Sequence, residues 1–262
     1  MNVITLVTDF GAKDWFVGTM KGVLLRAARR ANIVDITHEI PAGEIRTGAF
    51  ALAASCRFFP KGTVHVAVVD PGVGSARRPI AVQTTDYYFV GPDNGVLSFA
   101  LVHETIKQVR VLENAKYFLQ PVSRTFHGRD IFAPVAAQLS NGLSMQKLGR
   151  TLKDFTQLTW PEVKRTAHTI AGEILYLDRF GNAITNVERA ALSDLELTQC
   201  TVSGRGQWRC PVGAFYQGVP RGQPVALIGS TGRLEIAVNG GSAAKQLHLR
   251  IGDRVVLRRR NP

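Results

Sequence analysis

The first 150 residues alternate short apolar runs with longer segments whose apolar positions recur at helical spacing. The apolar runs predict strands at 3–9, 32–37 and 63–70, and the periodic segments predict helices at 16–30, 44–59, 95–104 and 128–142. Two more runs, RPIAVQT and DYYFVGPDNG, follow the third strand at hairpin distance and predict an inserted antiparallel pair. Alternating strands and helices are typical of a largely parallel sheet flanked by helices, so residues 1–150 are expected to form an α/β domain.

The pattern changes after residue 150. Residues 151–168 lose the periodicity and contain Trp160-Pro161, which indicates a linker. From 169 to 262, short apolar runs alternate with glycine-rich turns and show hardly any helical period. This texture predicts a smaller all-β, barrel-like domain of antiparallel strands.

Composition narrows the class of protein. The formal net charge is +12, but the basic residues are spread along the chain and no recognised nucleic-acid motif accompanies them, so we expect no nucleic-acid partner. No apolar run approaches the roughly 18 residues of a membrane helix, and no membrane partner is expected. The start, MNVITLVTDFG, lacks a basic region ahead of its apolar run and therefore indicates a first strand rather than a signal peptide.

The cysteines point to a reducing compartment. Cys56, Cys200 and Cys210 are widely spaced and odd in number, which favours reduced thiols in a cytoplasmic protein over a disulfide framework. The chain contains no CxxC or HxxxH spacing, so no zinc site is expected.

Candidate chemistry lies in four loops rich in Gly and Asp. They are TDFGAKDWF (8–16), DPGVGSARR (70–78), TFHGRD (125–130) and LDRFGNAITN (177–186). Asp9 and Asp70 each end a predicted strand, where open α/β sheets place ligands, although an Asp there also suits an ordinary turn. His127 precedes a Gly and a predicted helix start, and a lone His of this kind is more often structural than functional. The glycine spacing fits neither GxGxxG nor a P-loop, which argues against dinucleotide and NTP-phosphate sites.

Six motifs taken together carry a resemblance. TDFG, VVDPGVGSARR, VGPDNGVLSFA, TFHGRD, DRFGNAITN and GSTGRLEIAVNGGSAA occur in this order across essentially the whole chain. The chain thereby resembles the S-adenosyl-L-methionine (SAM) hydrolase family, also called SAM hydroxide adenosyltransferases, which is related to the fluorinase and chlorinase. The resemblance implies hydrolysis of SAM to adenosine and L-methionine by an activated water that attacks C5′. It also implies that no cofactor is needed and that a homotrimer holds the substrate between the N-terminal domain of one subunit and the C-terminal domain of the next.

The resemblance also implies residue roles. Asp70, Arg77 and His127 fill the positions that surround the attacking water, and whether Asp70 or His127 takes the proton stays open. The positions implied for substrate binding are Asp9 for the ribose hydroxyls, Asp178 for the methionine ammonium, Asn182 for the adenine, Ser230 for the carboxylate, and the backbone near Asn239 and Gly240 for the adenine edge.

The chain departs from the halogenating relatives at several positions. Thr231 and Val238 stand where those enzymes have arginines, Phe16 stands where they have a serine, and Gly128 replaces a serine of the fluorinase. The halogenating relatives also lack the equivalents of Asp70 and His127. A SAM-dependent halogenase is therefore a less favoured alternative, beside a non-catalytic SAM- or adenosine-binding protein and a basic nucleic-acid-binding protein.

Overall fold

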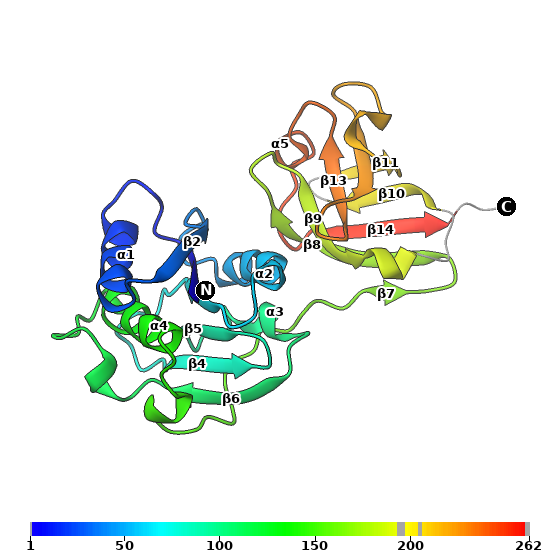
Figure 1. The fold of residues 1–262 in the computed structure, drawn as a ribbon. Helices are drawn as coiled ribbons and strands as arrows, with labels where there is room; N and C mark the ends of the chain where they lie inside the picture. Colours follow the sequence, from blue (N-terminus) through cyan, green and yellow to red (C-terminus); the bar gives the residue numbers. More distant parts are fainter. Residues whose placement is uncertain (1, 193–196, 204–205, 260–262) are drawn as a thin grey trace. The chain divides into compact units, whose positions relative to one another are not determined.

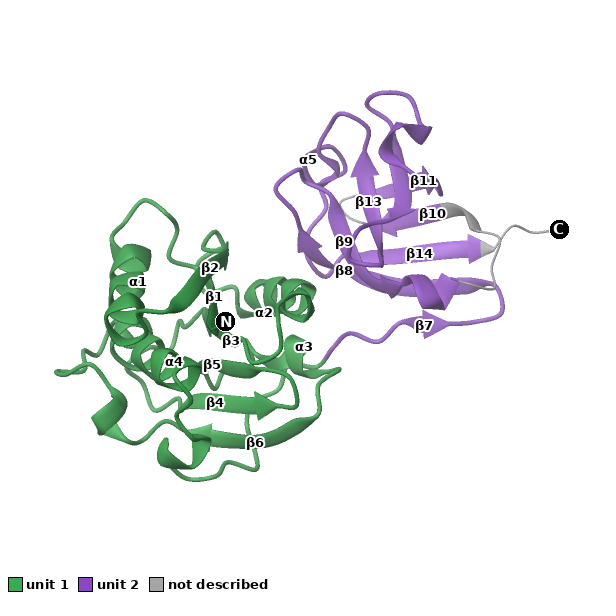
Figure 2. Cartoon of the chain, in the orientation of Figure 1, with its two compact units in different colours: residues 1–159 green, residues 160–262 purple. Residues whose placement is uncertain are grey.

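The computed structural model describes residues 2–192, 197–203 and 206–259. The chain divides into two compact units, residues 1–159 and 160–262 (Figure 2). Each unit contains its own apolar core, and the two are described separately.

The N-terminal unit is built on a six-stranded sheet of order β2-β1-β3-β5-β4-β6. Its strands are β1 (Asn2–Thr8), β2 (Ala31–Thr37), β3 (Val64–Val68), β4 (Pro79–Thr84), β5 (Tyr88–Pro92) and β6 (Ile106–Val111). The first four strands in that order are parallel, whereas β4 is antiparallel to both β5 and β6. The predicted α/β class and the predicted antiparallel pair are both confirmed.

Helices cover both faces of this sheet. They are α1 (Phe16–Ala27), α2 (Ile45–Ser55), α3 (Ser98–Leu101) and α4 (Ala133–Ser140), with 3-10 turns η1 (Cys56–Phe58), η2 (Ala115–Tyr117) and η4 (Met145–Lys147) and a π-helical turn η3 (Gly128–Phe132). None of the helices in the described part of the chain has the length and apolar content that crossing a bilayer requires.

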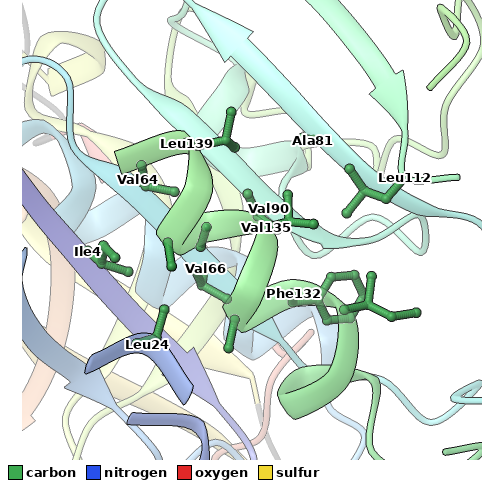
Figure 3. Close-up of a cluster of buried hydrophobic side chains, with 14 of the residues drawn as sticks. Ile4, Leu24, Val64, Val66, Ala81, Val90, Leu112, Phe132, Val135 and Leu139 are labelled. Carbon is green, nitrogen blue, oxygen red and sulfur yellow. The ribbon is translucent and has the colours of Figure 1, made fainter. Parts of the chain in front are cut away.

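Alternate residues of the central strands feed two separate cores. Ile4 of β1 and Val66 of β3 face α1 and α4, where they contact Leu24 and Val135 in the cluster drawn in Figure 3. Val7 and its neighbours on the other face pack against α2 and α3. Both faces of β1 and β3 are buried, which explains why these strands are apolar at nearly every position rather than at every second one.

Two segments differ from the sequence-based expectation. The predicted helix at 95–104 shortens to α3, because the chain turns after Leu101 and reaches β6, whose Ile106 pairs with Thr84 of β4. The predicted helix at 128–142 begins with the π turn η3 and becomes α-helical only at Ala133. Strand pairing ends the first helix, and the apolar period alone does not distinguish a π turn from an α turn.

The C-terminal unit is an antiparallel barrel-like sheet, as predicted. Its strands are β7 (Lys164–Arg165), β8 (Thr169–Leu177), β9 (Ala183–Glu188), β10 (Leu197–Ser203), β11 (Gln207–Pro211), β12 (Pro224–Ile228), β13 (Arg233–Val238) and β14 (Arg254–Arg259), with 3-10 turns η5 (Arg189–Leu192) and η6 (Tyr216–Gly218) and the short helix α5 (Ala243–Gln246). Their order is β11-β10-β14-β8-β9-β13-β12, and β7 pairs with β8. A bridge between Val212 and Ala226 joins the end of β11 to β12, so the sheet nearly closes on itself.

Candidate active site

The strand order of the N-terminal unit contains a reversal between β1 and β3. The chain leaves β1 through α1 to β2 on one side and returns through α2 to β3 on the other side (Figure 1). At such a switch point the connections diverge and leave a crevice beyond the carboxyl ends of the strands. Asp9 directly follows β1 and Asp70 lies two residues beyond β3, so both predicted carboxylates lie at this end of the sheet.

Asp70 and Arg77 form a bidentate ion pair across their own loop. Arg77 Nε donates to Asp70 Oδ1 at 2.9 Å, and Arg77 Nη2 donates to Asp70 Oδ2. The two side chains are only 5% and 10% exposed, respectively, so the charges are largely removed from water and compensate each other. The Arg77 guanidinium also lies over the Phe132 ring, with Cζ 5.5 Å from its centroid.

Arg77 also contacts His127, fifty residues further along the chain. Arg77 Nη2 donates to His127 Nδ1 at 2.8 Å. A guanidinium has donors and no acceptor, so Nδ1 must be the unprotonated nitrogen and the neutral imidazole carries its proton on Nε2. Burial and the Arg77 charge lower the pKa of His127 below its usual value, which favours this neutral form. Arg77 Nη1 is buried and has no hydrogen-bond partner within the described residues, so a donor remains available there.

The close approach of the two loops depends on glycine. Gly74 lies in the Asp70–Arg77 loop with φ of +75°, and a Cβ at this position would lie 2.2 Å from the carbonyl oxygen of Arg124. No other residue type can occupy this position without displacing that backbone. Gly74 therefore permits the contact that brings Arg77 to His127.

The motif VGPDNG holds both ends of the same loop. Asn94 Nδ2 donates to the carbonyl of Val69, directly before Asp70. Asp93, which is buried, accepts from Arg78 Nε at 2.7 Å, directly after Arg77. The motif thus fixes both ends of the Asp70–Arg77 loop.

The turn after β1 positions Asp9. Asp9 Oδ2 accepts a hydrogen bond from the backbone N–H of Gly43 at 2.8 Å, and the side chain is half-buried. The neighbouring Phe10 packs with Phe16 and Phe126, with ring centroids 5.2 to 6.0 Å apart. Phe16 is therefore part of an aromatic cluster that joins the Asp9 turn to the segment before His127.

Gly128 also lies in tight surroundings. A Cβ at Gly128 would lie 3.1 Å from Met20 Sδ and 3.3 Å from the Phe10 ring. The segment that carries His127 therefore packs directly on α1 and on the turn before it, and there is little room for a side chain at position 128.

In the C-terminal unit, Asp178 and Asn182 form one closed turn between β8 and β9. Asn182 donates from its backbone N–H to Asp178 Oδ1 at 2.8 Å and from Nδ2 to Asp178 Oδ2 at 3.0 Å. Gly181, with φ of +84°, lies between them, and a Cβ there would lie 1.9 Å from Ser242 Oγ. Asp178 and Asn182, two of the residues that the resemblance assigns to substrate binding, are thus in direct contact.

The remaining predicted residues lie on two loops of the same unit. Ser230 is exposed in the β12–β13 turn. Asn239 Nδ2 donates to the carbonyl of Val219 at 2.7 Å, so its side chain holds the neighbouring loop. Gly240 follows with φ of +68°. The backbone of Asn239 is paired as well, because its N–H donates to the carbonyl of Gln223 at 3.1 Å and its carbonyl accepts from the N–H of Gly222 at 2.8 Å.

The sequence reasoning did not identify Glu235 and Tyr216. Glu235 is 5% exposed on β13 and accepts a hydrogen bond from Tyr216 Oη at 2.7 Å. Burial raises the pKa of Glu235, the hydrogen bond from Tyr216 opposes this, and the charge of Asp178 raises it further; burial and Glu235 raise the pKa of Tyr216 to about 12. The signal that could have revealed Glu235 is an acidic residue inside the otherwise apolar run LEIAV.

The structure thus joins Asp70, Arg77 and His127 directly and places Asp9 at the neighbouring strand end. Asp178, Asn182, Ser230, Asn239 and Gly240 belong to the other unit. Across the described ranges, no group of three or more His, Cys, Asp or Glu side chains is arranged to hold a metal ion. The three cysteines are buried and free, as expected.

Comparison with known proteins gives a consistent result. Residues 4–149 match the model of the SAM hydroxide adenosyltransferase N-terminal domain, and residues 172–256 match that of its C-terminal domain. The chain is 39% identical to an (R)-S-adenosyl-L-methionine hydrolase of Thermus thermophilus, over 96% of this chain and 98% of the relative. It is 40% identical to an enzyme of the same name from Salinispora tropica, over 96% of each chain.

A more distant relative and a solved structure are also similar to this chain over nearly its full length. A fluorinase of an Actinoplanes species is 25% identical over 95% of each chain. The crystal structure of an uncharacterized conserved protein from Thermotoga maritima superposes with a TM-score of 0.91 at 36% identity, covering 97% of this chain and 99% of the other.

Proposed function

The chain belongs to the SAM hydroxide adenosyltransferase family, and we propose that it hydrolyses SAM to adenosine and L-methionine by attack of water on C5′. Sequence identity of 39% and 40%, over nearly the full length, to relatives named as SAM hydrolases carries this conclusion. The Asp70–Arg77–His127 cluster at the switch point supplies polar groups suited to a bound water, which supports hydrolysis over simple binding.

The chemistry requires little beyond an aligned nucleophile. The C5′ carbon of SAM is bonded to a sulfonium, so methionine leaves as a neutral thioether and needs neither a general acid nor a metal. The enzyme must hold a water opposite the C–S bond and accept one of its protons. We therefore expect no cofactor and no metal, and SAM is the substrate.

Asp70 is the proton acceptor in this proposal. Each carboxylate oxygen accepts from Arg77 and keeps a further lone pair for water. His127 presents Nε2–H, a donor, because Nδ1 accepts from Arg77; a nitrogen that already carries a proton cannot receive another. The geometry therefore favours Asp70 over His127 as the base, with His127 orienting the water as a hydrogen-bond donor. Arg77 orients the Asp70 carboxylate and holds His127 in the required tautomer.

Substrate recognition is assigned to the remaining residues. Asp9 would bind the ribose diol with the carboxylate oxygen that Gly43 does not occupy. In the C-terminal unit the proposed contacts are Asp178 to the methionine ammonium, Asn182 to adenine, Ser230 to the carboxylate, and the Asn239–Gly240 backbone to the adenine edge. The resemblance implies a homotrimer in which two subunits contribute to each site, and this is the proposed active form. The proposed location is the cytoplasm.

The names of the relatives specify the configuration at sulfur. Both curated relatives compared above are called hydrolases of the (R) form of S-adenosyl-L-methionine. We extend this preference to the present chain: the substrate is the (R)-sulfonium epimer, and the (S) epimer is a poor one.

One incubation tests the proposal. Purified protein is mixed separately with the (R) and (S) epimers, and adenosine and methionine are quantified by chromatography, with Asp70→Asn as the inactive control. Equal amounts of both products from the (R) epimer are expected. Binding of SAM without product would favour the non-catalytic SAM-binding protein, and turnover of both epimers at equal rates would contradict the epimer preference.

A further inference from the structure

A buried hydrogen-bond chain lies directly beneath the Asp9 turn. Thr8 Oγ1 and His38 Nδ1 are 2.8 Å apart, and both side chains are buried, with 0% and 9% of the residue exposed. Thr8 is the last residue of β1 and immediately precedes Asp9, whereas His38 directly follows β2. The contact therefore ties the ends of two neighbouring strands together at the switch-point edge.

The far side of the imidazole faces a carboxylate. His38 Nε2 lies 3.1 Å from Asp35 Oδ1, a close electrostatic contact that falls short of an aligned hydrogen bond. Asp35 is also paired with Lys21 of α1. Burial tends to raise the pKa of Asp35, but Lys21 and His38 together lower it below its usual value, so the carboxylate is ionised at neutral pH. An ionised carboxylate at Nε2 favours a proton on that nitrogen and leaves Nδ1 as an acceptor.

This tautomer determines which atom donates in each of these hydrogen bonds. The Thr8 hydroxyl donates to His38 Nδ1, and its oxygen accepts from the backbone N–H of Phe10 at 3.3 Å. The backbone carbonyl of His38 accepts from the N–H of Gly11 at 2.7 Å. His38 thus restrains the turn through its side chain before Asp9 and through its backbone after Asp9.

Hydroxyl, imidazole and carboxylate in this order also resemble a nucleophilic triad. Two observations argue against that role. Thr8 has no exposed surface, and its hydroxyl is engaged by both His38 and Phe10, so no substrate atom can reach it. The role that remains for Thr8, His38 and Asp35 is to position the turn that carries Asp9.

We propose that His38, oriented by Asp35, is a positioning residue for ribose recognition: it holds the Thr8–Gly11 turn so that Asp9 points its free carboxylate oxygen at the ribose diol. This inference rests on the proposed role of Asp9. His38 touches neither substrate nor water, and it acts through Thr8 and the backbone of the turn.

Thr8→Val removes the hydrogen bond to His38 while preserving the shape of the side chain. His38→Ala removes the imidazole and with it both of its side-chain contacts. Loss of one buried hydrogen bond that aligns a binding group should raise KM for SAM about tenfold and leave kcat within about twofold. His38→Asn is expected to restore KM, because the amide oxygen of Asn can take the place of Nδ1 as acceptor for Thr8.

The same strand supplies a matched control. Thr5 Oγ1 lies 2.7 Å from Nδ1 of the buried His65, so Thr5→Val removes a hydrogen bond of the same kind at a point away from Asp9. Thr5→Val should lower the melting temperature about as much as Thr8→Val without raising KM. An equal rise of KM in both variants would reduce the effect to general destabilisation and overturn the proposal.

Binding of products separates this inference from the proposed function. The affinities for adenosine and 2′-deoxyadenosine are measured by calorimetry. Thr8→Val and Asp9→Ala should each weaken the binding of adenosine, and their effects should not be additive. Both variants should weaken the binding of 2′-deoxyadenosine much less. If Asp9→Ala leaves adenosine affinity unchanged, the proposed role of Asp9 fails. If Asp9→Ala weakens binding and both Thr8→Val and His38→Ala do not, the role of His38 alone is wrong.

Discussion

Arg77 donates from Nη2 to Nδ1 of His127 at 2.8 Å, and this contact determines which nitrogen of the imidazole carries the proton. The same guanidinium binds both oxygens of Asp70. As a result of these contacts with Arg77, Asp70 can accept a hydrogen bond from a further ligand, and His127 can donate one from Nε2. A water that contacts both groups would be held in one orientation.

Asp70→Asn should reduce kcat by a factor of about 10² to 10⁴, the range that a positioned general base contributes, because the amide keeps the shape but cannot take a proton. Affinity for SAM, measured by calorimetry, should change little. Asp86→Asn, which removes a surface carboxylate paired with Lys61, is the control and should keep native kcat. A kcat near the native value in Asp70→Asn would remove Asp70 from the mechanism.

The rate should fall at acidic pH with a midpoint below 6.5. The pKa of His127 is lowered from 6.5 by burial and by Arg77, which outweigh the opposing charges of Asp70 and Asp130. Above that lowered pKa the imidazole is neutral and accepts from Arg77; below it, Nδ1 is protonated and two donors face each other. A kcat profile, combined with an NMR titration of His127, should give one acidic limb and a plateau through neutral pH. A limb centred above 6.5 would contradict the assigned tautomer.

Gly74→Ala should impair both folding and catalysis. A left-handed backbone costs a non-glycine residue on the order of 1–2 kcal/mol, and the added Cβ also meets the Arg124 carbonyl. Gly62→Ala is a matched control, since Gly62 has φ of +85° but an open environment. Denaturant unfolding should show a larger loss for Gly74→Ala, and kcat should fall only in that variant. Equal kcat in the two variants would mean that Arg77 and His127 do not need this close approach.

The oxygen of the product should come from water even when halide is abundant. The Asp70 carboxylate has acceptor oxygens and no donor proton, so it can accept a hydrogen bond from water but cannot donate one to a halide. Hydrolysis in ¹⁸O-water with added chloride or fluoride should therefore yield adenosine that carries the label at its 5′-oxygen. Formation of 5′-halo-5′-deoxyadenosine, or of unlabelled adenosine, would exclude attack by water.

Chelators should leave the rate unchanged, because a thioether leaving group requires no Lewis acid. Turnover is measured before and after prolonged dialysis against EDTA, followed by addition of Mg²⁺, Mn²⁺ or Zn²⁺. Loss of activity that one of these ions restores would show that the reaction uses a metal.

Much of the architecture follows from local pattern. β1 and β3 are apolar runs that end close to an Asp, so the location of Asp9 and Asp70 could be predicted from the sequence. β6 was not predicted because IKQVRV mixes charged and apolar residues. Its identity as a strand comes from pairing with β4, which a local reading does not include.

The site was less accessible to such reasoning. The contact of Arg77 with His127 joins positions fifty residues apart, and only the family resemblance grouped them. The partnership of Glu235 with Tyr216 and that of Thr8 with His38 had no local signature either. Each partnership depends on which loops come together within its own unit, and contacts between such distant positions leave no local pattern in the sequence.

Because residues Gly128–Phe132 form a π-helical turn, the orientation of His127 depends on the number of residues in this segment. A π turn contains about one residue more than an α turn, and one residue corresponds to about 100° of rotation around a helix axis. His127 precedes this turn, and the buried residues of α4 follow it. Deleting one residue would allow a regular α-helix, yet it would rotate His127 away from Arg77 while α4 kept its packing. Within this family, the segment should therefore tolerate substitution more readily than a change of length.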